Sequence, residues 1–111
     1  MAYDEDLAAR LRELLAGESD LTEKRMFGGL AFLLGGHMTV AASGQGGLMV
    51  RVDPAQTDAL VARDGVSRMV MRGREMDGWL RVETDVVRTK RQLEPWVRRA
   101  RAFVRALPPK A

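Results

Sequence analysis

Three runs of strand-forming residues, separated by two glycine-rich turns, make up residues 25–52, which read RMFGGLAFLLGGHMTVAASGQGGLMVRV. The runs are residues 25–34, 37–43 and 48–52, and each contains β-branched or large apolar side chains. Gly35-Gly36 fits a two-residue hairpin turn, because both central positions of a type I′ turn have positive φ. Residues 44–47 provide the second turn. The stretch therefore predicts a three-stranded antiparallel meander.

Helical patterns flank this meander. Residues 4–16 have an acidic first turn and leucines at positions 7, 11, 14 and 15, and Gly17 is expected to end this helix in a left-handed conformation. Asp53-Pro54 predicts the start of a second helix, because the carboxylate caps free N–H groups and proline has none to cap. That helix is expected to continue through residue 61 and to end at Gly65.

Two more strands and a final helix complete the chain. Residues 68–72 and 76–83 alternate in the pattern typical of strands. The final helix begins at Thr89, which opens a capping box with Gln92, and it ends before Pro108-Pro109. The expected fold is a single two-layer α+β domain over residues 1–111, with a five-stranded antiparallel sheet and the element order α-β-β-β-α-β-β-α.

The composition of the 111-residue chain excludes several classes of protein. With no cysteine and one histidine, the chain has no disulfide, no zinc–thiolate site and no multi-histidine metal centre, so neither a metal nor a cofactor is expected. Residues 4–6 are acidic where a secretory signal is basic, and the longest apolar run, residues 30–34, is too short to cross a bilayer. A cytoplasmic protein without membrane association is therefore expected.

Three short motifs resemble those of a known family. They are Arg25-Met26-Phe27-Gly28-Gly29 at the first strand, Gly78-Trp79 in the last strand, and Trp96 with Ala100 on the final helix. In these motifs the chain resembles the N-terminal domain family of the competence regulators TfoX and Sxy, from the first helix to residue 107. It departs from that family at Trp79-Leu80, where members often carry a tyrosine pair.

The resemblance implies a non-enzymatic regulatory or protein-interaction domain, with a protein partner or self-association. Because the competence regulators continue into a second helical domain, it also implies a stand-alone N-terminal module, to which their role in transcription regulation extends less directly. The motif residues themselves favour a structural role. Met26 and Phe27 are interpreted as apolar groups for the core, and Gly28-Gly29 as a bulge or close backbone approach.

Other residues with chemical potential lack the partners that catalysis requires. No second histidine or thiol can share a metal with His37. Residues 44–47 join two strands and lack the Gly-Lys-Ser/Thr ending of a phosphate-binding loop, so a turn is favoured. Carboxylates at positions 75, 77, 83 and 85 either gather at one end of strand 76–83 or pair with neighbouring arginines. No catalytic residues are expected.

Positive charge is concentrated in the second half of the chain. Residues 1–55 carry a net charge of −3 and residues 56–111 one of +6. Arg91, Arg98 and Arg105 recur every seven residues and drift only about 20° per step, so they form one stripe on the final helix. With Lys90 and Arg101 they are candidate nucleic-acid contacts, and Arg68, Arg72 and Arg81 beside Trp79 form a candidate second patch. The alternative is an ordinary charged outer face of a core-packing helix.

Overall fold

The computed structural model describes residues 3–108, which contain three α-helices, two short 3-10 helices and six strands. The helices are α1 (Glu5–Leu15), η1 (Pro54–Gln56), α2 (Thr57–Val61), η2 (Thr84–Val87) and α3 (Lys90–Arg105). The strands are β1 (Leu21–Met26), β2 (Gly29–Leu34), β3 (His37–Ala42), β4 (Leu48–Arg51), β5 (Val66–Met71) and β6 (Arg74–Val82).

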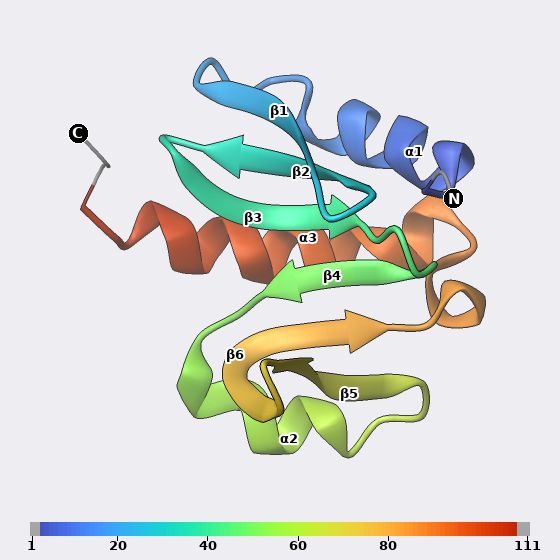
Figure 1. The fold of residues 1–111 in the computed structure, drawn as a ribbon. Coiled ribbons are helices and arrows are strands. Elements are labelled where there is room, and N and C mark those ends of the chain that lie inside the picture. Colours follow the sequence, from blue (N-terminus) through green and yellow to red (C-terminus); the bar gives the residue numbers. More distant parts are fainter. Residues whose placement is uncertain (1–2, 109–111) are drawn as a thin grey trace.

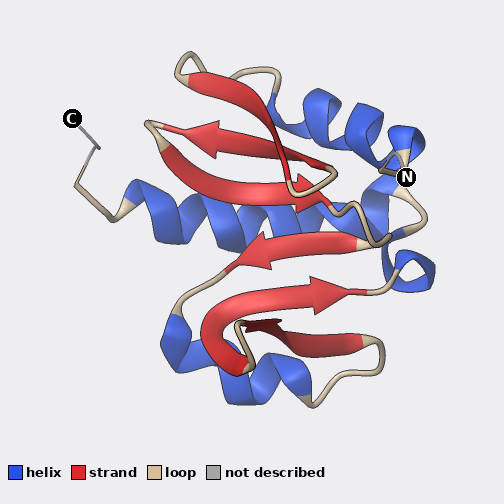
Figure 2. Cartoon of the chain, in the orientation of Figure 1, coloured by secondary structure: helices blue, strands red, loops and turns tan. Residues whose placement is uncertain are grey.

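All six strands belong to one antiparallel sheet in the order β1-β2-β3-β4-β6-β5. The helices α1 and α3 lie behind this sheet, and α3 contacts β2, β3 and β4 (Figure 1). The short helix α2 lies against β5 and β6, at the opposite edge of the sheet from β1 (Figure 2). The fold is thus α+β, as the sequence predicts.

The core lies between the sheet and the two long helices. Helix leucines meet alternate residues of the central strands, and these side chains are all fully buried: Leu7, Leu11, Leu15, Phe32, Leu34, Val40, Val50, Leu80 and Leu93. Removing one such side chain from water contributes roughly 1.5–3 kcal/mol. This core fixes which strand ends and turns remain outside it.

The sheet has six strands and not the five predicted. The sequence pattern predicts one strand over residues 25–34, whereas β1 and β2 pair as a hairpin, from Leu21↔Leu34 to Met26↔Gly29. Phe27 and Gly28 are the two turn residues, with φ values of 51° and 77°. The prediction missed this turn because its first position carries phenylalanine, where type I′ turns prefer asparagine or glycine.

Two further hairpins have the same two-residue geometry. Gly35 and Gly36 join β2 to β3 with φ values of 58° and 84°, which confirms the predicted turn. Arg72 and Gly73 join β5 to β6 with φ values of 53° and 77°. The three turns differ in the side chain at the first position, which is the basis for comparing them below.

The long helices begin as their sequences predict. The Asp4 carboxylate accepts hydrogen bonds from the N–H groups of Asp6 and Leu7 at 3.0 and 3.1 Å. At the start of α3, Thr89 and Gln92 form both hydrogen bonds of the capping box, each 3.1 Å long. The predicted capping box is confirmed, because it involves residues only three positions apart, whereas the cap at Asp4 is an addition to the predicted acidic first turn.

The predicted helix ends are less accurate. Gly17 does not have a positive φ, and α1 closes instead through the N–H of Ala16 and the carbonyl of Glu13. The second helix is divided into η1 and α2 and ends at Val61, so its expected end at Gly65 is wrong. Gly65 does have a positive φ of 77°, but it leads into β5.

Candidate functional site

The β1–β2 turn holds a large apolar side chain in solvent. Phe27 is 88% exposed, the highest value among the exposed large hydrophobic residues of the described chain. The interpretation of Phe27 as a core residue is therefore wrong, and Met26 is only half-buried. Phe27 lies beyond the last strand pair, Met26↔Gly29, at the tip of the hairpin.

At two glycines, the backbone of this turn lies in close contact with the β3–β4 connection. A Cβ at Gly29 would lie 2.5 Å from the carbonyl oxygen of Ala42, and a Cβ at Gly44 would lie 2.8 Å from the carbonyl oxygen of Phe27. Both distances are too short for a side chain, so the predicted close backbone approach at Gly29 is confirmed. Figure 1 shows the two connections meeting beside the end of β3. The turn that contains Phe27 is consequently fixed to the sheet. Arg25, in the same hairpin, is exposed.

The glycine of the second motif has a structural role. Gly78 is buried with a φ of 84° and bends β6 over η1. Its N–H donates to the Thr57 hydroxyl, and its carbonyl accepts from the N–H of Val52, both at 2.8 Å. A side chain at this position would press against Pro54 at 3.1 Å.

The tryptophans of the family motifs lie against arginines. Trp79 is half-buried, with the guanidinium of Arg51 4.8 Å from its ring centre. Trp96 is 3% exposed, and the guanidinium of Arg99 lies 4.9 Å from its ring centre. Ala100 is fully buried in the core. The motif residues therefore do not form one site.

Three of the five cations proposed on the final helix are paired with carboxylates. Lys90 lies 3.6 Å from Glu13, and Arg98 pairs with Glu94 one helical turn away. Arg105 holds both oxygens of Asp20, at 2.6 and 2.7 Å, and reaches Glu18 at 2.5 Å. Arg91 is exposed and Arg101 half-buried, and within residues 3–108 neither forms an ion pair. Part of the charge asymmetry is thus neutralised between the two halves of the chain.

The contact between Arg105 and Asp20 makes stability depend on pH. Hydrogen bonds from Arg105 hold the pKa of the Asp20 carboxyl below its ordinary value of 3.8. A lowered folded-state pKa stabilises the fold above the unfolded-state pKa, and this contribution disappears as the pH falls through the folded-state value. We expect Arg105→Ala to lower the urea midpoint at about pH 7 and the difference from the wild type to narrow towards about pH 2. A constant difference across that range, measured by urea titration, would contradict this assignment.

The remaining candidates are dispersed over the surface. Asp77 pairs with Arg68 at 2.8 Å and Asp85 with Arg88 at 2.6 Å, so these carboxylates pair with arginines and do not gather. The guanidinium of Arg81 donates a hydrogen bond of 3.0 Å to the side-chain oxygen of Gln45, in the β3–β4 turn. His37 is partly exposed, with Nε2 2.6 Å from the carbonyl oxygen of Pro108. Among residues 3–108, no group of three or more acidic or histidine side chains could hold a metal ion.

Sequence reasoning missed two groups of arginines and aromatic rings along α3. Arg51 contacts the rings of Trp79 and Phe103, with its guanidinium 4.8 and 5.3 Å from the ring centres. Arg99 contacts Trp96 in the same way. One signal was available, because residues 96, 99 and 103 follow three-four spacing and so share one side of the helix. The residues from β4 and β6 come from other parts of the chain, and no sequence spacing relates them to α3.

Comparison with known proteins identifies a family. Residues 13–104 match the family model described as the TfoX N-terminal domain. The match includes all six strands and the three motifs. Searches of curated proteins and of solved structures gave no match. No helix within residues 3–108 has both the length and the apolar character needed to span a membrane.

Proposed function

Because the chain belongs to the TfoX N-terminal domain family, we propose that it is a non-enzymatic protein-interaction module whose contact element is the β1–β2 hairpin tip, residues 24–29. The observation that carries this proposal is Phe27, a phenylalanine that is 88% exposed and has a φ of 51°. Folding gains almost nothing from an aromatic ring in water. Partner binding would bury that ring and so supplies a reason for its presence.

Comparison of the three two-residue turns supports this interpretation. A left-handed φ costs an L-residue about 1–2 kcal/mol, and glycine avoids that cost, as it does at Gly35. Phe27 and Arg72 both have a left-handed φ and therefore both carry this energetic cost. An exposed arginine is well solvated, whereas an exposed phenylalanine also leaves its ring unburied. Phe27 is therefore the less favourable of the two for folding alone.

The surroundings of the tip indicate the chemistry of the partner. Lys24 and Arg25 are exposed on β1, and neither forms an ion pair within the described part of the chain. β1 is also an edge strand, paired on one side with β2. A partner protein with an apolar pocket for Phe27 and an acidic rim would match both features.

Affinity capture followed by binding with purified components tests the proposal. The chain is immobilised, a native lysate is passed over it, and the retained protein is purified and titrated against the variants. We expect Phe27→Ser to weaken binding about tenfold or more, since central aromatic anchors dominate interface energies. Val70→Ser is the matched control, because Val70 is 61% exposed on the β5–β6 hairpin, and it should change the affinity little.

Two results would overturn this function. One is equal binding by Phe27→Ser and the wild type. The other is a strict monomer, measured by size-exclusion chromatography with light scattering, that also retains no partner from the lysate. Self-association lost in Phe27→Ser would instead identify the partner as a second copy of the chain.

Nucleic-acid contact through α3 is a second candidate function. Its support is Arg91, which is exposed and unpaired within residues 3–108, together with Arg98 and Arg105 on the same stripe. The pairing of three of the five cations reduces the charge available to phosphates. If this function holds, retention of duplex DNA should fall steeply with salt, and Arg91→Glu with Arg98→Glu should abolish it. Absence of retention at low salt would exclude this candidate.

A further inference from the structure

Strands β2, β3 and β4 carry apolar side chains on both faces of the sheet. Their sequences are GLAFLL, HMTVAA and LMVR. An antiparallel strand with one face in water normally alternates apolar and polar residues, whereas nearly continuous apolar runs are typical of strands covered on both faces. The three central strands therefore have the sequence of a sheet that lies between two layers.

Helices cover only one face of these strands. Alternate residues belong to the core that faces α1 and α3, among them Phe32, Val40 and Val50. On the other face, Figure 1 shows no helix in front of β2, β3 or β4 among the described residues. We call this the open face, and its larger apolar side chains are Leu33, Met38 and Met49. Each of these three is half-buried, so part of its surface reaches solvent.

A row of paired residues crosses the open face from one side to the other. Successive partners in the strand register are Lys24 of β1, Ala31, Ala41, Met49 and Arg81 of β6. The two alanines are buried, so the accessible apolar surface belongs to Met49 and, in the next row, to Leu33 and Met38. The open face thus has an apolar centre with a cation on either side.

Among residues 3–108, no carboxylate pairs with either of these two cations. Lys24 is exposed, and Arg81 donates to two uncharged oxygen atoms of the β3–β4 turn. β2, β3 and β4 contain no acidic residue, and Glu23 of β1 pairs with Arg12 of α1 at 2.7 Å on the opposite face. The open face is therefore complementary to a surface with an apolar centre and acidic margins.

The spacing of the strands matches the width of one helix. Neighbouring strands lie about 4.8 Å apart, so the backbones of Lys24 and Arg81, four spacings apart in the sheet, are separated by about 19 Å. An α-helix with its side chains is about 10–12 Å across. One helix laid along β3 would therefore cover the apolar centre and bring the residues on its two flanks towards both cations.

Two other occupants fit the open face less well. A second copy of the chain bound through the same face would bring like charges together, which is unfavourable. Single-stranded nucleic acid stacks its bases on aromatic rings, and β2, β3 and β4 have no aromatic ring on this face. On the neighbouring β6, the ring of Trp79 already has the guanidinium of Arg51 4.8 Å from its centre. Charge and shape thus favour an acidic amphipathic helix.

We propose that the open face binds an acidic amphipathic helix of a partner protein. The apolar stripe of that helix packs on Leu33, Met38 and Met49. Its acidic flanks lie against Lys24 and Arg81. The bound helix supplies the second cover that the apolar runs of β2, β3 and β4 indicate. This surface adjoins the hairpin tip at Lys24 but uses none of the apolar residues of the tip, so the two contacts can be tested separately.

A synthetic helix tests the proposal directly. The probe is a fluorescein-labelled peptide of 16 residues, the length of α3, held helical by a hydrocarbon staple on the side opposite its apolar stripe. Leucines at three-four spacing form that stripe, and glutamates lie on both sides of it. We expect saturable binding in fluorescence anisotropy, and binding about tenfold weaker or worse when lysines replace the glutamates. A peptide of the same composition with scattered leucines should also bind about tenfold more weakly or worse.

Two methionine substitutions form a matched pair. Met49→Gln places a polar side chain of similar size in the apolar centre and should weaken peptide binding about tenfold. Met71→Gln makes the same change at a residue that is 43% exposed at the end of β5, away from the open face. It should leave the affinity within about twofold. Urea denaturation of both variants establishes that they are folded.

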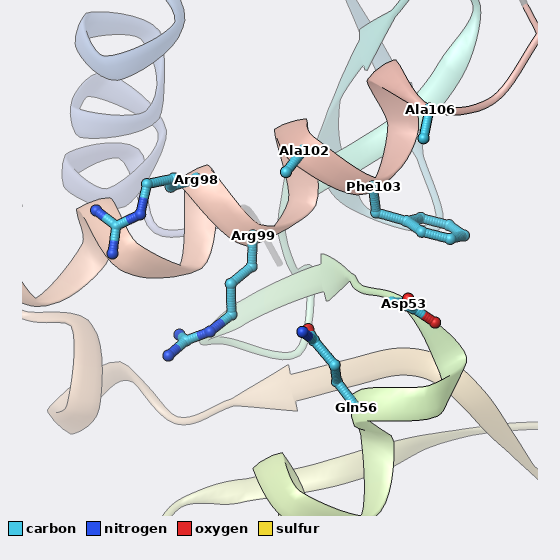
Figure 3. A pocket seen from close by; sticks show the side chains of 7 residues that line it. All are labelled: Asp53, Gln56, Arg98, Arg99, Ala102, Phe103 and Ala106. Atoms are coloured by element: carbon cyan, nitrogen blue, oxygen red, sulfur yellow. The ribbon is translucent and has the colours of Figure 1, made fainter.

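Two further substitutions separate the open face from α3, which lies on the other side of the sheet and is also positively charged. Arg98 and Arg99 of α3 line a hollow between this helix and η1 (Figure 3), and Arg91 is exposed on the same helix. Lys24→Gln should weaken peptide binding about threefold or more, because the acidic flank loses a cation. Arg91→Gln removes an exposed cation from α3 and should change the affinity by less than about twofold.

Several outcomes would overturn the proposal. It fails if the acidic peptide does not bind, or if the analogue with lysines binds equally well. It also fails if Met49→Gln and Met71→Gln have equal effects on the affinity, since the apolar centre would then have no role. A larger loss in Arg91→Gln than in Lys24→Gln would show that the peptide lies on α3, which contradicts the proposal as well.

Two further results would identify a different occupant or a different surface. Loss of peptide binding in Phe27→Ser but not in Met49→Gln would place the peptide on the hairpin tip, which rejects the open face and leaves the proposed function standing. A labelled oligothymidylate that displaces the peptide from the wild type and binds Met49→Gln weakly would show that the face binds single-stranded nucleic acid instead. If Met49→Gln is unfolded, Leu33→Gln takes its place, with the same expected loss.

Discussion

Gly29→Ala is expected to lower the free energy of unfolding by about 1–3 kcal/mol, the usual cost of forcing an extra methyl group into a packed site. A Cβ at this position would lie 2.5 Å from the carbonyl oxygen of Ala42 and 2.9 Å from the nitrogen of Gly44. Both are backbone atoms that no side-chain rotation can move away. The β3–β4 connection would have to shift, and the Phe27 turn that contacts it would shift as well. Urea denaturation at equilibrium measures the loss.

Gly17→Ala is the matched control for this substitution. A Cβ at Gly17 would meet nothing within 4 Å, and Gly17 has no positive φ. The same chemical change should therefore be neutral or should stabilise the fold by about 0.4–1 kcal/mol, through the entropy of the unfolded chain. Equal losses in both variants would show that the close approach between the two connections does not constrain the fold.

Phe27→Asn is expected to weaken partner binding about tenfold or more while it stabilises the isolated domain. Asparagine is among the residues that type I′ turns prefer, so the folded state should gain about 0.5–1 kcal/mol. Little packing is lost, because the Phe27 ring is 88% exposed. Opposite effects on stability and on binding would separate a contact residue from a structural one, since a structural residue would lose both together.

Arg72→Asn is the control for the turn itself. Arg72 holds the equivalent position of the β5–β6 turn, with a φ of 53° against 51° at Phe27. Its replacement should give a similar gain in stability and leave partner binding unchanged. A loss of stability in Phe27→Asn but not in Arg72→Asn would mean that Phe27 supports the fold.

Much of the fold follows from local sequence signals. The capping box at Thr89 and the Gly35-Gly36 turn each depend on residues within four positions of one another, and both are confirmed. The sixth strand was missed because the turn that separates β1 from β2 lacks such a local signal. Phenylalanine occupies a turn position where asparagine or glycine is usual.

The surface contacts lie beyond sequence reasoning of this kind. Arg105 and Asp20 are 85 residues apart, and the rings around Arg51 come from β6 and α3. Helical spacing could have shown the pairing of Arg98 with Glu94, four residues earlier, but it does not show that Glu18 and Asp20 reach Arg105. The contacts of Arg105 and of Arg51 join segments that are far apart in the sequence, so only the assembled fold determines them.

The most direct test of the hairpin tip as the contact element is the amount of partner retained by immobilised wild type, Phe27→Asn and Arg72→Asn under identical conditions. The partner is the protein captured by the wild type, or a second copy if the chain associates with itself. We predict that Arg72→Asn retains as much as the wild type and that Phe27→Asn retains about a tenth or less. Equal retention by the two variants, or no retention by the wild type, would contradict the account.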